Sequence, residues 1–534
     1  MKSLILYPIL GLKTNVPYTD PSLFKWLGEG VAQSHCVDGR NIDFARTRNA
    51  CSKSEGLGNW SNDAVATPSY CQGIFELYDG TNRVIWMVYD GDVYRYDSSR
   101  DPQEVADAGA TAFASDAADL YSFIRYGSYM VFADRAEHTS YCSDYNDANL
   151  IKLISSGTEF KVRYLESFAR RIIGAYVVSN PVVLTDALSI IWSNANPTPN
   201  TDCAFAAANQ LYVPNDDPIT GIKKMGQNAC YVYCENSINR LDYYVNYNAP
   251  FGFTTMVDGQ GATNHHSIVN ENSANYFYNK NYGFCAYSGG AQIVPISTDI
   301  ENWTRDIKVS STPYIVGASL PYKNSIAWTV PLEAAGSPNA ILIYDYAENK
   351  WTRRDFTAHY LAPIIRASNV TWTKLITELD YTTWTSLGAL RWTDLISETP
   401  SLACSATDGE LYTLSTESNN GSDYDGYRIE PALAFGGNNR HSILTEIWFS
   451  IVSGGAFSLY VYYRSGNTET ELRNANWVAL DEVSFNEPEN AVCYINGETQ
   501  KSNRLHQIKW GTDSKNEQFI VNQIEFIYKS EGRY

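Results

Sequence analysis

Cysteine, methionine, histidine and basic residues are all scarce in this sequence. Its 534 residues include 10 Cys, 5 Met and 7 His, and 40 Lys and Arg stand against 59 Asp and Glu, which gives a net charge of −19. Ten cysteines in a chain of this length are far below the density of a disulfide scaffold. So few basic residues argue against a nucleic-acid binder of the usual kind, because affinity for phosphates comes from Lys and Arg.

Long apolar runs are absent as well. No segment approaches the ~20 apolar residues that a membrane-spanning helix needs, so no membrane is expected as a partner. The stretch Leu4–Leu12 follows Lys2 as in a signal peptide, but Pro8 interrupts it and no small-residue cleavage site follows. We therefore predict an ordinary first β-strand here.

The closest pair of cysteines, Cys230 and Cys234, lies in an alternating run. If that run is a strand, both side chains share one face, but their Cα atoms are ~13 Å apart at ~3.3 Å per residue. A disulfide tolerates at most ~7 Å between Cα atoms. We expect reduced, mostly buried thiols, as in a protein assembled in a cytoplasm.

Aromatic residues, by contrast, are plentiful. The chain has 39 Tyr, 20 Phe and 13 Trp, and aromatics make up 13% of it. Tyr and Trp favour pleated, half-buried surfaces, so an all-β protein is the first expectation.

The clearest local signal is a β-hairpin near residue 90. Two alternating runs, Val84–Tyr89 and Asp92–Tyr96, flank an Asp90-Gly91 pair that supplies the positive φ angles of a type I′ turn. Six further pairs of runs of the same kind follow along the chain: 130–134 with 139–142, 171–177 with 189–193, 230–236 with 237–241, 275–279 with 283–287, 341–345 with 350–353, and 402–405 with 411–414.

This recurrence is typical of a β-propeller. The turns are about 44 to 66 residues apart, and a four-stranded blade takes ~40–50 residues. The longer intervals carry insertions: residues 295–301, where we predict a short helix with Ser297 or Thr298 as N-cap, and a Trp-Thr-x-Leu tandem at 371–395. We predict an all-β fold with a propeller of six to eight blades; a two-sheet sandwich and a β-helix are the alternatives.

The two ends of the chain differ from the hairpin region. Residues 1–60 are rich in Gly and Pro, which predicts an extended N-terminal arm, and residues 61–420 form the predicted propeller. After a polar linker, residues 421–534 alternate strongly, which predicts a C-terminal β-sandwich-like domain.

Motifs for catalysis are missing. The sequence has no Gly-x-Ser-x-Gly, His-Glu-x-x-His, Gly-Lys or Cys-x-x-Cys. His265 and His266 are adjacent and would point to opposite faces of a strand. We predict no catalytic residue, cofactor or metal ligand. A glycosidase is not excluded, because a propeller would draw its catalytic acids from different blades and leave no local motif.

Several segments, in order, resemble β-propeller tail-hub or packaged-DNA stabilisation proteins of short-tailed bacteriophages. They are Gly11-Leu-Lys-Thr-Asn15, Asp38-Gly-Arg-Asn41-Ile-Asp-Phe44, Ser54-Glu-Gly56, Asp216–Lys223, the hairpin at 230–241, Gly252-Phe, Gly261–Asn270, Tyr282-Gly-Phe, Pro295-Ile-Ser297 and the tandem at 372–395. Glu55 stands where a basic residue is more usual in that family. The resemblance covers about residues 1 to 420.

The resemblance implies a structural virion protein rather than an enzyme. Copies would form a closed ring of six below the portal and adaptor, in contact with other tail proteins. The ring would be a tail hub or nozzle, assembled in the host cytoplasm, that retains packaged DNA and forms part of the ejection conduit. An anionic wall would let double-stranded DNA pass without specific binding.

For the contacts between subunits we favour the arm and the C-terminal domain, because neither is needed to close the propeller. The candidate contact residues are Asp38, Arg40, Asn41 and Phe44 of the arm and Trp372, Trp384 and Trp392 of the tandem. The rival hypothesis is a carbohydrate-binding or glycoside-hydrolysing propeller, of a receptor-binding or depolymerase type, in which the tandem would stack on sugars.

Overall fold

The computed structural model describes most of the chain. It covers residues 2–531 with the exception of 45–49, 67, 79–82, 98–99, 108–112, 114–115, 135–140, 144–148, 153, 156–157, 160, 180–185, 200–202, 207–208, 245–249, 368–397, 417–421, 436–439, 454–456, 481, 486–490, 497–501, 515–516 and 518. No helix in this described part is long and apolar enough to cross a membrane.

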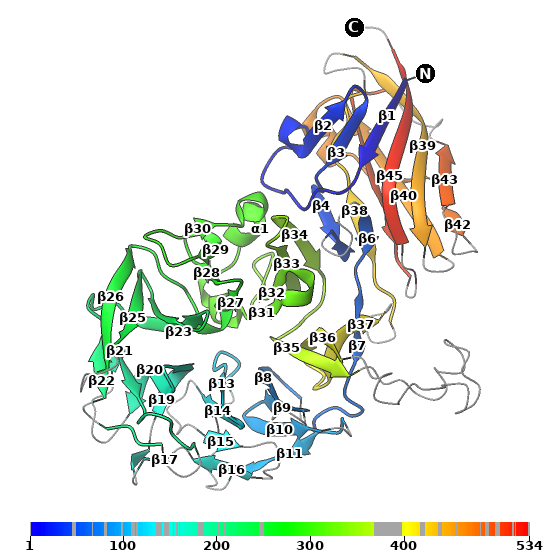
Figure 1. Cartoon of the computed structure of the whole chain (residues 1–534). Coiled ribbons are helices and arrows are strands. Elements are labelled where there is room, and N and C mark those ends of the chain that lie inside the picture. The colour runs from blue at the N-terminus through cyan, green and yellow to red at the C-terminus, as the bar shows by residue number, and fades with distance from the viewer. Residues whose placement is uncertain are drawn as a thin grey trace, which may run out of the picture.

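Seven sheets among the described residues form the blades of a β-propeller (Figure 1). The first strand of each blade faces the axis, and these inner strands contact one another in ring order, with the last next to the first. The inner strands are β8 (Cys71–Tyr78), β13 (Ser122–Tyr126), β19 (Lys161–Phe168), β23 (Ile219–Met225), β27 (Val269–Glu271), β31 (Gly317–Leu320) and β35 (Tyr360–Ala367). The predicted all-β propeller is confirmed.

The remaining strands of each blade run outward from the axis in antiparallel order. The second strands are β9 (Arg83–Tyr89), β14 (Tyr129–Ala133), β20 (Arg171–Ser179), β24 (Ala229–Cys234), β28 (Ala274–Asn279), β32 (Ser325–Val330) and β36 (Glu398–Ser405). The third strands are β10 (Asp92–Tyr96), β15 (Tyr141–Ser143), β21 (Asp186–Trp192), β25 (Ser237–Tyr243), β29 (Gly283–Tyr287), β33 (Ala340–Asp345) and β37 (Leu411–Thr416).

The outermost strands are shorter on average and one of them comes from elsewhere in the chain. They are β11 (Gln103–Glu104), β16 (Asn149–Lys152), β22 (Gln210–Tyr212), β26 (Phe251–Asp258), β30 (Val294–Pro295), β34 (Lys350–Arg354) and β7 (Gly56–Asn59). Strand β12 (Ala106–Asp107) adds to the second blade, and β17 (Ile154–Ser155) pairs with β18 (Thr158–Glu159). Because β7 pairs with β37, the N-terminal part of the chain closes the ring of blades.

The seven predicted hairpins are all present. Six of them join the second and third strands of a blade, whereas the pair at 341–353 joins the third and fourth strands, β33 and β34. Asp90 and Gly91 have φ angles of 56° and 89°, as the type I′ turn requires. The predicted short helix consists of η3 (Thr298–Ile300) and α1 (Glu301–Arg305).

Ser297 occupies the N-cap position of that helix, which is one of the two positions predicted. Ser297 precedes η3, but its side chain makes no cap hydrogen bond. Its Oγ instead accepts a hydrogen bond from the backbone N–H of Phe284 in the neighbouring strand (2.9 Å). The serine therefore fastens the inserted helix to the fifth blade.

Two sheets beside the propeller form a β-sandwich (Figure 1). One sheet has the order β2 (Phe24–Gly28), β3 (Val31–Ser34), β1 (Lys2–Tyr7), β45 (Phe519–Ser530), β39 (Ser442–Ser453) and β43 (Ala491–Asn496), with β5 (Ile42–Asp43) and β6 (Cys51–Lys53) at its side. The other sheet has the order β4 (Asp38–Arg40), β38 (Gly426–Ile429), β44 (Leu505–Thr512), β40 (Phe457–Gly466) and β41 (Val478–Ala479), with β42 (Val483–Phe485) on β40.

In the described part of residues 1–60, which we predicted to be an extended arm, several strands pair with distant parts of the chain. Strand β1 pairs with β45, and β4 pairs with β38, so the first strands of the chain lie inside the sandwich with the last ones. The apolar side chains of β1, Leu4 and Leu6, are buried there. The sandwich is thus built from both ends of the chain, and these strands bury apolar side chains against each other.

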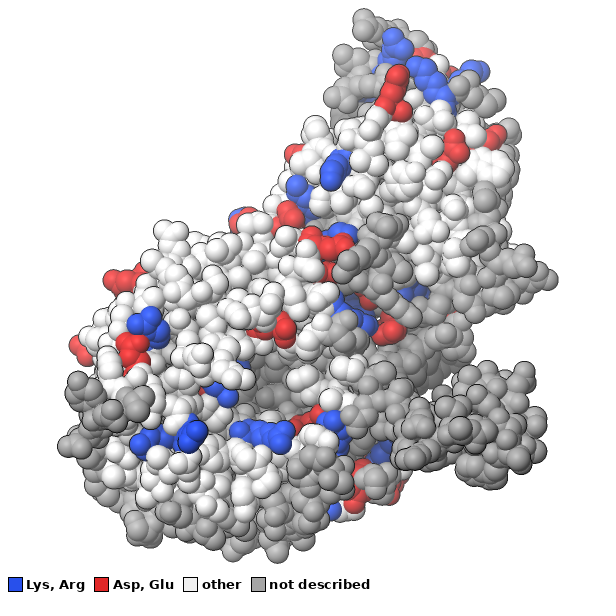
Figure 2. Space-filling model, viewed as in Figure 1, with Lys and Arg blue, Asp and Glu red and all other residues white. Residues whose placement is uncertain are grey.

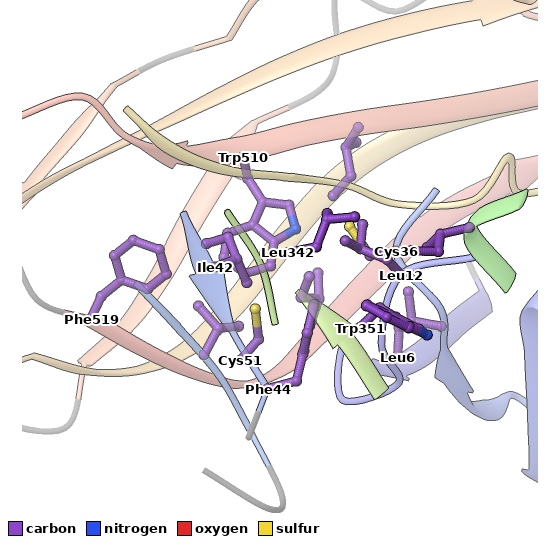
Figure 3. Packing of buried hydrophobic residues seen from close by; sticks show 14 of the residues in the cluster. Leu6, Leu12, Cys36, Ile42, Phe44, Cys51, Leu342, Trp351, Trp510 and Phe519 are labelled. Atoms are coloured by element: carbon purple, nitrogen blue, oxygen red, sulfur yellow. The ribbon is translucent and has the colours of Figure 1, made fainter. Parts of the chain in front are cut away.

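One hydrophobic core continues from the sandwich into the sixth blade. Trp351 and Leu342 of this blade pack near Leu6, Leu12 and Phe44 of the N-terminal segment (Figure 3). The backbone N–H of Leu12 donates to the carbonyl of Trp351 (3.1 Å), which ties the two parts together. The propeller and the sandwich therefore share buried apolar surface at their junction.

The described cysteines are buried thiols without a disulfide: Cys36, Cys51, Cys71, Cys203, Cys230, Cys234, Cys285 and Cys404. Cys230 and Cys234 lie on one strand and face the same core cluster, as the alternation predicted. Burial raises the pKa of the Cys36 thiol to about 12. Such a thiol stays protonated and unreactive at neutral pH.

Candidate functional site

The predicted contact residues of the N-terminal segment lie at the junction of sandwich and propeller. Phe44 is 1% exposed and belongs to the shared core. Asn41 is also buried; its side chain donates to the carbonyl of Asp425 (2.7 Å) and accepts from the backbone N–H of Asp355 (3.0 Å). Because these contacts lie within the chain, Asn41 and Phe44 offer no surface to a second subunit. Trp372, Trp384 and Trp392 fall outside the described residues.

Asp38 and Arg40 line a hollow of about 460 Å³ at the same junction. Arg40 pairs with Asp355 (2.9 Å), which also accepts from Arg353 (2.9 Å). Arg353 in turn reaches Glu333 at 3.2 Å, and burial raises the pKa of the Asp38 carboxyl. The charges of this hollow are thus balanced by one another, as in a structural ion-pair network that fixes two domains.

A cavity of about 280 Å³ lies at the centre of the propeller. Residues of five inner strands and of η2 (His265–Ser267) line it, among them Phe75, Phe123 and Tyr360. Glu76 is the one carboxylate among its described lining residues, and both of its oxygens accept from the backbone N–H of Ile365 (3.1 and 3.2 Å). A glycosidase of the usual kind needs two carboxylates on either side of its substrate, so this cavity lacks the required pair in its described lining.

Ser122 and His265 form a hydrogen-bonded pair in the lining of this cavity. His265 Nε2 lies 3.3 Å from Ser122 Oγ, and His265 Nδ1 accepts from the backbone N–H of Ile222 (3.3 Å). The proton of the neutral ring therefore sits on Nε2 and is donated to the serine. A catalytic base would have to accept a proton from the serine instead. The pair consequently locks blades together and does not activate a nucleophile.

The position of His265 was not expected from the sequence. It lies in the 3₁₀ turn η2 rather than on a strand, because Asn264 caps that turn by accepting from the backbone N–H of His266 (2.7 Å). An Asn just before a histidine pair is a turn signal that could have been used. No group of three or more His, Cys, Asp or Glu side chains suited to a metal ion occurs in the parts of the chain that the structure describes.

Three buried histidines and one partly buried histidine make the stability of the fold depend on pH. Burial lowers the pKa of His265, and it lowers the pKa of His35, His359 and His506 to about 4. In the unfolded chain these groups titrate near ~6.5. Between pH 6.5 and 4 the unfolded chain therefore binds protons that the folded chain excludes, and the free energy of unfolding falls as the pH falls.

We expect a decrease of up to ~1.4 kcal/mol per pH unit for each such histidine, measured by urea denaturation at pH 7, 6 and 5. Replacing His359, which accepts from the backbone N–H of Cys71, with glutamine should reduce the slope by about one proton. A free energy of unfolding that stays constant from pH 7 to 5 would contradict this prediction.

The clearest exposed apolar feature of the sandwich is its edge strand β2. Trp26 is 57% exposed and Leu27 is 54% exposed. β2 pairs with β3 on one side, and among the described strands nothing pairs with its other side. The ring of Phe24 lies 5.9 Å from that of Trp26 and holds it. An open edge with two bulky apolar side chains is typical of a surface that another chain covers.

Comparisons with known proteins place this chain in no family. No family model matches it. No curated protein matches it either. The fold and the surfaces described above therefore have to be interpreted from the chain's own residues.

Several solved structures are similar to it, all at low identity. The extracellular domain of a protein assigned as a hybrid two-component system from B. thetaiotaomicron is 9% identical, with a TM-score of 0.39 over 70% of this chain and 46% of that one. The β-propeller domain of Cps50 (Swd1) from Myceliophteria thermophila is 9% identical, with a TM-score of 0.39 over 67% of this chain and 100% of that one. An exo-β-1,3-galactanase from Phanerochaete chrysosporium is 10% identical, with a TM-score of 0.27 over 79% of this chain and 98% of that one. The fold assignment accordingly rests on the order of the strands.

Proposed function

We propose that the chain is a structural protein of a bacteriophage tail, a hub or nozzle whose copies form a closed ring below the portal and adaptor. The observation that carries the proposal is the open apolar edge of β2, with Trp26 and Leu27 in solvent. This strand belongs to residues 1–60, the segment from which contacts between subunits are expected. In the ring, the sandwich of a neighbouring copy would cover the edge.

Some described residues in the segments that carry the family resemblance stabilise the blades. Asp217 accepts from the backbone N–H of Asn236 (2.8 Å) and from Ser237 Oγ (2.9 Å), and so holds the turn between β24 and β25. A Cβ added at Gly261 would lie 2.0 Å from the carbonyl oxygen of Cys234.

Double-stranded DNA would pass through the lumen of the ring and not through the propeller itself. The central cavity of about 280 Å³ is far too small for a duplex. A net charge of −19 gives the wall of such a lumen little affinity for a polyanion. The ring of six copies and the neighbouring portal-adaptor proteins follow from the resemblance alone.

Electron microscopy and native mass spectrometry of the purified full-length protein test the proposal. We expect rings of uniform size, and the same protein on the tail axis of phage particles after labelling. Trp26→Glu should abolish ring formation, because a buried charge would lie at the contact. Val309→Glu, at a valine that is 73% exposed on the propeller, should leave the rings intact.

A monomeric wild-type protein, or rings that persist in Trp26→Glu, would contradict the assembly that we propose. The rival function, hydrolysis of a host polysaccharide, predicts product formation that disappears when one acidic residue is replaced. The single carboxylate in the described lining of the central cavity, Glu76, does not favour it.

A further inference from the structure

Turns of three neighbouring blades form a cleft of about 550 Å³ on one face of the propeller. Each turn joins the first and second strand of its blade, and one basic residue lies in it or at the end of the strand before it: Arg125, Arg170 and Lys224. No Asp or Glu occurs among the described residues that line the cleft. In Figure 2, Lys and Arg side chains form a broken row across the lower part of the propeller, where acidic side chains are fewer. The cleft is therefore basic, although the whole chain has a net charge of −19.

Two of the three cations are left for a ligand. Lys224 Nζ donates to Ser167 Oγ (3.0 Å) and lies 3.6 Å from Glu166, so its charge is largely compensated. Arg125 Nε donates only to the carbonyl of Gly127 (3.0 Å), and Arg170 makes no ion pair among the described residues. Two guanidinium groups at one concave site are suited to a planar anion such as a carboxylate.

The turn that carries Arg170 is held in an unfavourable conformation. The neighbouring turns use Gly127 and Gly226, with φ angles of 63° and 62°. In the turn between them, Ala169 and Arg170 have φ angles of 49° and 59° without being glycine. The left-handed conformation is unfavourable for a residue that carries a Cβ. Strain of this kind is typical of positions that serve binding.

Neighbouring residues fix the position of this strained turn. The Tyr126 hydroxyl donates to the carbonyl of Arg170 (2.9 Å), and the backbone N–H of Asn196 donates to the same oxygen (2.8 Å). The turns of the second and third blades are therefore linked directly. Arg170 is presented by a preorganised backbone, which lowers the entropic cost of binding.

A second hollow, of about 740 Å³, adjoins the cleft and has a different character. The two share Phe168, Ala169 and Gln227 in their linings. The second hollow adds the half-exposed rings of Tyr243 and Tyr244, which are 42% and 46% exposed. Amide and aromatic side chains in a concave site are suited to sugar hydroxyls and to the apolar faces of sugar rings.

The two charged residues of the second hollow neutralise each other, so they do not oppose the binding of a sugar. Arg240 and Asp242 pair with each other at 2.7 Å. The ring of Tyr243 is supported from behind by Phe251, with ring centroids 5.5 Å apart. The hollow is thus close to neutral and has a firmly placed aromatic wall.

We propose that the two hollows form one groove that binds an acidic oligosaccharide. The carboxylate of one sugar unit lies between Arg125 and Arg170, and neighbouring units stack on Tyr243 and Tyr244 and bond to Gln227. A nucleic acid fits less well, because tight binding of its backbone requires cations along an extended face. Here the unpaired cations are confined to one end. All residues of this groove belong to one chain, so glycan binding does not require the ring. It would be a second function beside the structural one.

Isothermal titration calorimetry of the full-length protein with a panel of carboxylate-bearing oligosaccharides tests the proposal. The panel contains an oligogalacturonate, a hyaluronan fragment and an oligosialic acid, with the methyl ester of the oligogalacturonate as the neutral match and a short DNA duplex as the competing polyanion. We expect at least one acidic glycan to bind and the methyl ester and the duplex to bind at least tenfold more weakly. Arg125→Gln/Arg170→Gln should lower the affinity at least tenfold, and Tyr243→Ala should lower it severalfold.

The matched control removes the same charge elsewhere. Lys25→Gln/Arg305→Gln changes two exposed basic residues outside the groove and should leave the affinity unchanged. The proposal is overturned if no acidic glycan binds, if the duplex binds as tightly as the best glycan, or if the control lowers the affinity as much as the double variant in the groove. Circular dichroism of each variant separates loss of binding from loss of fold.

Discussion

Replacing Glu430 with glutamine is expected to destabilise the protein by roughly 3–5 kcal/mol, because it leaves the charge of Arg428 buried and unpaired. Both side chains are 0% exposed, and Arg428 Nε donates to Glu430 Oε1 at 2.6 Å. Burial alone would lower the pKa of Arg428, but the carboxylate of Glu430 keeps it raised. A guanidinium is a very strong base that stays protonated in proteins, so Arg428 keeps its charge in the variant and has no counter-ion.

The pair also connects segments that are far apart in the sequence. Arg428 donates to the carbonyls of Ser34 (2.9 Å) and Leu10 (3.3 Å), near the start of the chain. Ser34 Oγ and Trp510 Nε1 both donate to the Glu430 carboxylate, at 2.8 and 3.1 Å. The network thus joins the N-terminal strands to the C-terminal ones at the centre of the sandwich. Loss of one of its side chains therefore destabilises both sets of strands.

Chemical denaturation measures this effect, and two variants serve as references. Glu301→Gln removes the carboxylate of an exposed pair with Arg305 and should cost less than about 1 kcal/mol. The double variant Arg428→Met/Glu430→Leu removes both buried charges and should be less destabilised than the sum of its single variants. Additive single effects would show that the two side chains do not stabilise the fold as a pair.

Replacing Trp351 with alanine is expected to have a similarly large effect and to uncouple the two domains. Its side chain is 1% exposed, and its Nε1 donates to the carbonyl of Ile296 (2.9 Å). Its ring lies 4.8 Å from Tyr344 and 5.5 Å from Phe284. A cavity of this size costs roughly 3–5 kcal/mol. Because the cavity would open in the core shared with the sandwich, the coupling between the domains weakens as well.

Differential scanning calorimetry distinguishes loss of stability from loss of coupling. We expect one unfolding transition in the wild-type protein and two in Trp351→Ala. Trp86→Ala is the control, because Trp86 is equally buried but lies in the first blade, in a cluster without sandwich residues. It should lower the transition temperature and keep a single transition. Two transitions in the wild type, or two in the control, would contradict the shared core as the source of coupling.

The hairpins could be predicted from the sequence because each depends on residues close together in the chain. Asp90 and Gly91 fix one turn through their own φ angles, and the alternating runs on either side pair with each other. Their regular recurrence was enough to predict a propeller. The blade number followed only from the structure, because it depends on which inner strands lie next to each other around the axis.

The role of the N-terminal segment could not be predicted in the same way. Its Gly and Pro content indicates extended backbone, which is what β1 to β7 have. Nothing local tells that β1 pairs with β45, or that β7 closes the last blade on β37. Such pairings depend on complementary apolar faces several hundred residues apart. For the same reason Asn41 and Phe44, predicted as surface contacts, are internal to the chain.

The candidate sites, too, were predictable from the sequence only in part. Trp26 and Leu27 lie in the segment predicted to make contacts between subunits, but their exposure is a property of the folded edge strand. Arg125, Arg170 and Lys224 are separated by about one blade each along the chain and have no local motif. Only the ring of blades brings their turns to one cleft.

By itself, the sequence determined the strand content, the hairpins and the burial of the described thiols, because all three depend on local pattern or composition. It also determined the sign of the overall charge. The tertiary structure decided how the ends of the chain combine into one sandwich and where two buried charges stabilise that sandwich. It also decided where basic residues gather in one cleft of an otherwise acidic protein. These depend on contacts between distant residues, and their free energy appears only when the chain is folded.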